Sequence, residues 1–297
     1  MTRLSSGLNG TIGETLPSEL RGQLEIAVRA ARVAAEAGAQ SALLQLGVAD
    51  EEAPAHLNEP QRVLRRRLRA HARVLGDPLG ADGSQAVQRL VWESAYEHWH
   101  RMLFARFLAE RHLLIWEGTV SVTLDECHEL AGLSGTALEV RSGWELAGRL
   151  AERMLPKLFR SDSPVIALRF APEHQQALER LLAGLPQTVF LASDSLGWAY
   201  QFWQGKRKEE VNASQVKVGA DELPPVTQLF TEPYMVEYLL HNTIGAVWRA
   251  SHPELAERLP LRYLVTPNAG ESEQPSTSKI GRFGSLKLMD PCCGSGH

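Results

Sequence analysis

The last stretch of the chain, residues 286–297, reads Leu-Lys-Leu-Met-Asp-Pro-Cys-Cys-Gly-Ser-Gly-His. A short apolar run reaches an acid and a proline and then breaks into Gly-Ser-Gly, a pattern typical of a buried strand followed by a ligand-cradling turn. We expect residues 286–289 to form the first strand of a Rossmann-like sheet, with Asp290 at its carboxyl edge, where open sheets bind ligands. Most of such a domain would lie beyond His297.

Length and composition indicate a soluble globular protein. The 297 residues are 44% hydrophobic, but no apolar run approaches the roughly 18 residues that a membrane span requires. The first residues lack the apolar core of a secretory signal, so we expect a cytoplasmic protein with no membrane partner. Cys127 stands alone, and Cys292 and Cys293 are adjacent, which excludes a disulfide framework and a CxxC pair.

The formal net charge of -4 and the pI near 6.2 provide no global positive field for nucleic acid. Any such contact must be local, and one segment qualifies. Its arginines are Arg62, Arg65, Arg66, Arg67, Arg69 and Arg73. Leu64, Leu68, Ala72 and Leu75 recur there at helical spacing, so the segment is predicted to be a basic amphipathic helix. Two interpretations stay open: a solvated or acid-paired face, and a phosphate-backbone contact by Arg62, Arg65, Arg66, Arg69 and Arg73.

The remainder of residues 1–220 is predicted to be mainly helical. Apolar periodicity indicates helices near residues 18–45, 84–116, 121–133, 144–159 and 173–182, with Pro156 bending or shortening the fourth. Residues 165–170 fit a strand or a helical approach to Pro172. Residues 204–215 fit a loop or the end of a helix. We therefore expect one helical domain at 1–220 and the start of a second domain at 221–297.

Two groups in the helical part invite a catalytic or metal interpretation. His98 and His100 alternate along a helix and therefore point in different directions, so we predict no metal there. Cys127 and His128 are adjacent in a polar helix and do not face each other, which favours a buried structural cysteine over a Cys-His nucleophile.

A second motif precedes the terminal turn. Residues 230–233 read Phe-Thr-Glu-Pro, with Thr231 placed to cap a helix and Pro233 in its first turn. Val236, Leu239, Leu240 and Ile244 would give this helix an inward apolar face. Residues 249–283, which separate the two motifs, include a loop-like stretch at 267–278.

These two motifs, in this order, resemble those of amino-group DNA methyltransferases. Residues 290–297 resemble motif I, Asp-Pro-x-x-Gly-Ser-Gly, and residues 230–233 resemble the motif X that lies upstream of it in one adenine-specific group. Residues 221–248 also resemble the large adenine methyltransferases of phage-defence systems, the BREX type and the fused type IIG restriction enzymes. The resemblance extends more weakly to residues 96–112.

The resemblance implies a class I methyltransferase domain, cut short at His297, that binds S-adenosylmethionine. The implied cofactor-binding residues are Phe230, Thr231, Pro233, Asp290, Pro291, Gly294 and Gly296. Without Cβ atoms, the two glycines let the backbone approach a ligand closely. A phosphate-binding P-loop is the competing chemistry, but the Lys-Ser/Thr pair is absent and Asp-Pro precedes the turn.

Such enzymes flip an adenine out of double-stranded DNA against an Asn/Asp-Pro-Pro-aromatic loop. Pro224 and Pro225 lie between Leu223 and Val226, so the 297 residues contain no such loop and no catalytic residue that we can name. The resemblance implies the N-terminal portion of a DNA adenine-N6 methyltransferase of restriction-modification or phage defence, inactive alone, with DNA and other defence subunits as partners. The alternatives are a non-catalytic DNA- or protein-interaction module and a methyltransferase acting on RNA or protein.

Overall fold

The computed structural model describes residues 14–132, 140–160, 162–214, 219, 223–227, 229–258, 260–265 and 289. These residues are mainly helical and fall into two compact units, residues 1–203 and 204–297. The boundary lies within one continuous helix, α8 (Ser195–Ser214), and differs from the sequence-based division after residue 220. A truncated Rossmann-like domain stays a prediction.

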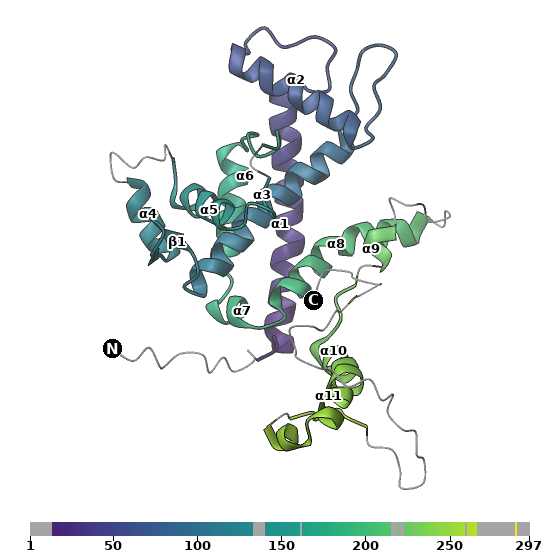
Figure 1. Ribbon diagram of the computed structural model, residues 1–297. Helices are drawn as coiled ribbons and strands as arrows, with labels where there is room; N and C mark the ends of the chain where they lie inside the picture. The colour runs from purple at the N-terminus through teal and green to yellow at the C-terminus, as the bar shows by residue number, and fades with distance from the viewer. Residues whose placement is uncertain are drawn as a thin grey trace. The chain divides into compact units, whose positions relative to one another are not determined.

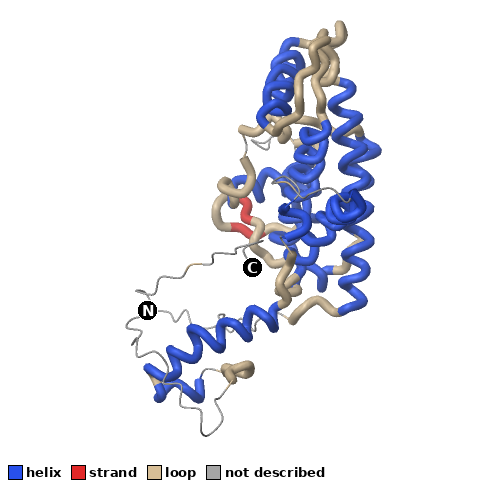
Figure 2. Tube along the Cα trace, turned by 90° about the vertical axis from the view of Figure 1, so that its right-hand side faces the viewer, coloured by secondary structure: helices blue, strands red, loops and turns tan. Residues whose placement is uncertain are grey.

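The first unit contains the following elements in chain order. They are α1 (Ser18–Gln45), α2 (Glu59–Val74), α3 (Gln88–Glu110), β1 (Ile115–Trp116), β2 (Val120–Ser121), α4 (Leu124–Gly132), α5 (Gly143–Met154), α6 (Pro172–Ala183), α7 (Gln187–Leu191) and the start of α8. The two strands pair antiparallel, Ile115 opposite Ser121 and Trp116 opposite Val120, and appear in Figure 2 as the small red segment.

The long helix α1 is the axis of this unit, with α3 and α6 packed against it (Figure 1). Its buried face carries small side chains, including Ala31, Ala35 and Ala39. Small residues let neighbouring helices approach closely, and Gly38 shows how closely: a Cβ there would lie 2.8 Å from the Phe170 ring. The bounds of α1 agree with the predicted 18–45.

Aromatic rings fill the core beside α3. Trp99 stacks on Trp203 of α8 with ring centroids 4.3 Å apart, and Tyr96 meets Trp203 edge-on. The buried Arg32 of α1 donates from Nη1 to the Trp203 carbonyl at 2.6 Å and pairs with Glu36 at 2.7 Å. The helix predicted near residues 84–116 therefore contributes a broad face to the core.

A second layer extends from α3 through α5 to α4. Ser142 caps α5 by accepting a hydrogen bond from the Glu145 backbone, and α5 ends at Met154, two residues before Pro156. The predicted shortening of this helix is confirmed, because a proline disfavours helical backbone in the residue before it.

For three segments, the sequence-based prediction was too long or had left alternatives open. The helix predicted to reach residue 116 ends at Glu110, since His112 takes a positive φ of 56° that α-helices do not tolerate. Residues 165–167 lie in a turn and residues 168–170 have no regular secondary structure, so the strand alternative was wrong. Residues 204–214 continue α8, so the interpretation as a helix end is confirmed, with Val211 buried.

In the second unit the elements are short. After the remainder of α8 they are α9 (Leu223–Thr227), α10 (Pro233–Leu240), the π-helical turn η1 (His241–Gly245), α11 (Ala246–Ser251) and the 3-10 helix η2 (Pro253–Arg258). Across the described residues of both units, the helices are either too short or too polar to cross a membrane.

Two histidines are packed inside the first unit. His98 bonds to the Val165 carbonyl at 2.9 Å and stacks on Phe170. Burial lowers its pKa to about 4, and the charge of Arg101 acts in the same direction. Burial alone lowers the pKa of His100 to about 4. The rings around His100 are Tyr96, Phe104 and Phe159.

These depressed pKa values predict acid lability. Both histidines are neutral in the folded state, whereas the unfolded imidazole titrates near 6.5, so stability is complete above pH 6.5 and is lost as pH falls toward 4. At pH 5 each contributes a loss of about 2 kcal/mol. Replacing His100 by Phe retains an aromatic ring and removes one titrating group.

The measurement is the free energy of unfolding between pH 7.5 and 4.5. We expect the curve of His100→Phe to fall less steeply than that of the parent chain, with the two converging in slope above pH 7. Parallel curves over the whole range would contradict a buried neutral His100.

Candidate functional site

The upstream motif begins α10. Phe230 is buried, with 6% of its surface exposed, and Pro233 occupies the first helical position. The N-cap is Glu232, and no side-chain cap hydrogen bond forms, so the expectation that Thr231 caps the helix was wrong. Proline prefers the first helical position, where its missing N–H costs nothing, and this places the cap at residue 232.

The apolar face of α10 also differs from expectation. We predicted that Leu239 and Leu240 point inward, but they are 62% and 45% exposed, and no residue of α10 is buried. Tyr234, Met235 and Tyr238 are about half exposed as well. Burial of a helical face requires a second layer, and the short elements described in this unit do not cover this face.

The side chain of Asn242 connects the turn after α10 to residues 260–265. Asn242, in the π turn, donates from Nδ2 to the carbonyls of Tyr238 (2.8 Å) and Tyr263 (2.7 Å). Its Oδ1 accepts from the Val265 backbone N–H at 2.8 Å. One amide thus ties residues 260–265 to the turn, and Arg262 adds an ion pair to Glu237 with Nε at 2.7 Å. π turns are frequent at functional sites.

The other half of the predicted cofactor signature lies outside the described residues. This applies to Asp290, Pro291, Gly294 and Gly296, and to the strand expected at 286–289 apart from the exposed Met289. The meeting of the two motifs in one pocket therefore stays a prediction.

In the basic helix α2, Arg65 is buried and bound to backbone. Its Nε donates to the Gly47 carbonyl at 2.9 Å, and its Nη2 reaches the carbonyls of Asp50, Glu51 and Glu52 at 2.5 to 3.1 Å. These carbonyls belong to the loop that connects α1 to α2. A guanidinium supplies five donors and can therefore bind several carbonyls of one loop at once.

Arg69 extends this contact to a second loop. It donates to the Val48 carbonyl (2.8 Å), to the Asp50 carbonyl and to the Gly83 carbonyl (2.8 Å). We call Arg65 and Arg69 the carbonyl clamp, because together they fasten both loops beside α2 to the helix.

The remaining arginines of α2 vary in their surroundings. Arg62 donates to the Leu57 carbonyl at 2.9 Å and is partly buried. Arg66 is largely exposed and pairs with Glu59 at 3.1 Å. Arg73 is exposed and bonds to Gln85 at 3.3 Å. Arg66 and Arg73 thus present their charge to solvent more than the carbonyl clamp does.

Cys127 is fully buried in α4, and burial raises the pKa of its thiol to about 11. A protonated thiol is a poor nucleophile. The described part of the chain contains no cluster of three His, Cys, Asp or Glu side chains that could bind a metal ion. This includes the surroundings of His98, His100 and Cys127.

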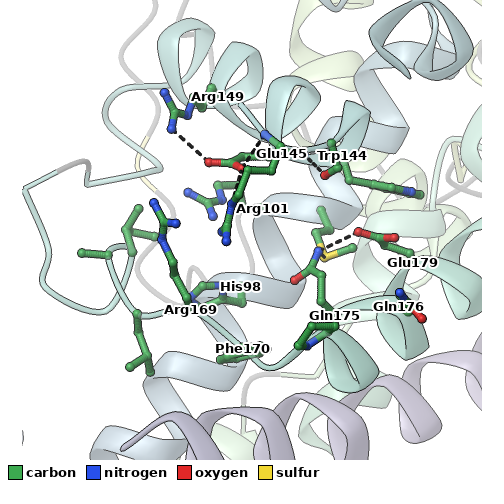
Figure 3. A pocket seen from close by; sticks show the side chains of 18 of the residues that line it. His98, Arg101, Trp144, Glu145, Arg149, Arg169, Phe170, Gln175, Gln176 and Glu179 are labelled. Carbon is green, nitrogen blue, oxygen red and sulfur yellow. Dashed lines mark hydrogen bonds and ion pairs between the residues drawn. The ribbon is translucent and has the colours of Figure 1, made fainter. Parts of the chain in front are cut away.

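The sequence interpretation missed a cavity of about 660 Å³ in the first unit (Figure 3). It lies among α3, α5, α6 and residues 166–170. Arg101, which helical periodicity places on the polar side of α3, projects into it beside Glu152. The only signal of this cavity in the sequence is that Arg and Glu residues are interspersed with apolar residues along α5. That pattern alone also fits a solvent-exposed helix face.

Two curated proteins are similar to this chain. Over 135 residues it is 31% identical to the adenine-specific methyltransferase BrxX of Escherichia coli O9:H4 (strain HS), covering 42% of this chain and 11% of that protein. Over 280 residues it is 24% identical to the adenine-specific methyltransferase PglX of Lacticaseibacillus casei (strain Zhang), covering 79% of this chain and 23% of that protein. The chain is similar to adenine-specific methyltransferases. It spans less than a quarter of the length of these relatives, and no family model matches it.

The carbonyl clamp predicts a stability difference within α2. Arg65→Met preserves helix propensity and the aliphatic stem but removes the donors to four carbonyls, so we expect a loss of at least about 2 kcal/mol in unfolding free energy. Arg66→Met is the matched control, because an exposed ion pair contributes less than about 1 kcal/mol. Urea unfolding measures both, and equal losses would exclude the clamp.

The Asn242 bridge predicts local ordering. Asn242→Asp keeps the acceptor for Val265 but loses the two donated bonds, and Asn242→Leu loses all three. We expect amide hydrogen exchange of residues 261–265 to accelerate about tenfold in the Asp variant and more in the Leu variant. Asn212→Asp, on exposed α8, is the control. Unchanged exchange in both Asn242 variants would show that the bridge does not hold this segment.

Proposed function

We propose that this chain is part of an S-adenosylmethionine-dependent DNA adenine-N6 methyltransferase of a restriction-modification or phage-defence system. The observation that carries the proposal is the similarity to two proteins named adenine-specific methyltransferases, one of them over 280 residues. The order of the two cofactor motifs, residues 230–233 before residues 290–296, supports it independently.

In this proposal the motif residues hold the cofactor. Asp290 with Pro291 ends a strand beside the methionine part of S-adenosylmethionine, and Gly294 and Gly296 let the backbone approach it. Phe230, Thr231 and Pro233 close over the same pocket. Two features of the described residues fit this role. Phe230 is held in place by burial, and Pro233 fixes the backbone at the start of α10.

DNA contact by α2 is the second part of the proposal. Arg62, Arg65, Arg66, Arg69 and Arg73 form the candidate surface, and Arg66 and Arg73 are the members whose exposure suits a phosphate. The carbonyl clamp would shape that surface by holding both neighbouring loops. We further propose a cytoplasmic protein that acts with other defence subunits.

The test compares the 297-residue chain with the whole polypeptide that its gene encodes. Transfer of labelled methyl groups from S-adenosylmethionine to double-stranded DNA is measured. We expect no transfer by the 297 residues, which lack an Asn/Asp-Pro-Pro-aromatic loop, and N6-methyladenine from the longer polypeptide.

Asp290→Ala in the longer polypeptide should weaken S-adenosylmethionine binding about ten- to a hundredfold, because a charged hydrogen-bond partner is lost. Asp162→Ala, in an exposed turn of the first unit, is the control. Methylation of RNA or protein in place of DNA would refute the substrate class. Turnover by residues 1–297 alone would refute the division of the catalytic machinery.

A further inference from the structure

The cavity of the first unit is lined by charged groups from four directions. Arg101 comes from α3, Arg149 from α5, Arg141 from the start of α5 and Arg169 from the connector to α6. Figure 3 shows Arg101, Arg149 and Arg169 on one side of the cavity. Gly148 of α5 lies beside Arg101, and a Cβ there would be in ordinary van der Waals contact with its Nε at 3.4 Å.

The carboxylates of the cavity do not neutralise these arginines evenly. Glu145 accepts from Arg149 at 2.9 Å and lies 3.5 Å from Arg141. Burial opposes ionisation of Glu145, yet the hydrogen bonds from Arg141 and Arg149 outweigh it and lower its pKa. One carboxylate is therefore shared by two arginines.

Arg101 and Arg169 are left with weak or no partners among the described residues. Arg101 has side-chain exposure of 18%, but its ion pair with Glu152 spans 3.8 Å, longer than a hydrogen bond. Arg169 makes no hydrogen bond or ion pair with the described part of the chain. Two guanidinium groups thus face the cavity with most of their donors unused.

The opposite wall holds two carboxamides and the carboxylate of Glu179, over an apolar base. Gln175 and Gln176 of α6 lie there, and Glu179 accepts from Gln175 at 3.0 Å and not from an arginine (Figure 3). Met102 and Leu168 add apolar surface to the lining. Carboxamide groups both donate and accept hydrogen bonds, as the polar edge of a nucleobase does.

We propose that this cavity binds a nucleoside monophosphate, with the phosphate on Arg101 and Arg169 and the base toward Gln175 and Gln176. Paired guanidinium forks match phosphate geometry and charge. Four arginines against three glutamates line the cavity, a small positive excess that suits one phosphate better than a triphosphate. The volume of about 660 Å³ is within the range of about 300 to 1,000 Å³ typical of small-ligand sites.

The residues that line this cavity belong to the first unit, whereas the cofactor motifs belong to residues 204–297. The site therefore does not rest on the proposed methyltransferase function. Either proposal can fail without the other, because nucleotide binding at the cavity requires neither S-adenosylmethionine nor DNA.

Isothermal titration calorimetry of the 297-residue chain tests the proposal. The ligands are AMP, GMP, CMP and UMP, with adenosine and inorganic phosphate as the two partial ligands. We expect saturable binding of at least one nucleotide with Kd below about 1 mM, and binding at least about tenfold weaker for each partial ligand. Failure of all four nucleotides, or equal affinity for phosphate alone, overturns the proposal.

Variants then locate the site. Arg169→Gln removes an exposed guanidinium that supports no other contact, so the chain should fold and bind about tenfold more weakly. Arg101→Gln should weaken binding at least as much, with thermal unfolding measured in parallel because this side chain is part of the fold. Arg160→Gln, at an exposed arginine outside the cavity, is the matched control. Unchanged affinity in Arg169→Gln would refute this placement.

Discussion

The need to satisfy buried guanidinium groups shapes the first unit of this protein. Most of the 31 lysines and arginines of the whole chain are arginines, and several arginines of this unit donate to backbone carbonyls. Arg65 binds the loop after α1, and Arg111 donates to three successive carbonyls, those of Phe190, Leu191 and Ala192. A loop carbonyl that is buried without a donor costs stability, and a guanidinium can satisfy several at once.

This use of arginine divides the basic residues by role. Where carbonyls or carboxylates accept hydrogen bonds from the guanidinium, as for Arg32 and Arg65, the charge supports the fold. Arg101 and Arg169 in the cavity make no such hydrogen bond within the described residues, and we propose that their charge serves a ligand. The same principle separates the members of α2 and assigns its carbonyl clamp to loop positioning before any contact with DNA.

The described part of the second unit is held together differently from the first. Its described helices are short and expose an apolar face at Tyr238, Leu239 and Leu240, and Asn242 ties the turn after α10 to residues 260–265. No residue of α10, η1 or α11 is buried among the described residues. The whole chain covers at most 23% of either adenine-specific methyltransferase to which it is similar.

Much of the helical architecture could be predicted from the sequence, because it follows from local patterns. The alanine periodicity of α1 fixed its bounds, and Pro156 fixed the end of α5. The role of Arg65 could not be predicted, since its carbonyl partners lie 13 to 18 residues away in a loop without periodicity. The exposure of Leu239 and the cavity around Arg101 could not be predicted for a related reason. Both depend on which helices pack against one another, and the spacing of apolar residues does not determine that.

Arginine side-chain hydrogen exchange, followed by NMR at the Nε–H groups, tests the division of arginines most directly. The account predicts slow exchange for Arg65 and Arg111, whose Nε–H groups donate to carbonyls at 2.9 Å, and fast exchange for Arg169. Exchange at Arg65 as fast as at Arg169 would contradict the account, because both guanidinium groups would then be equally free.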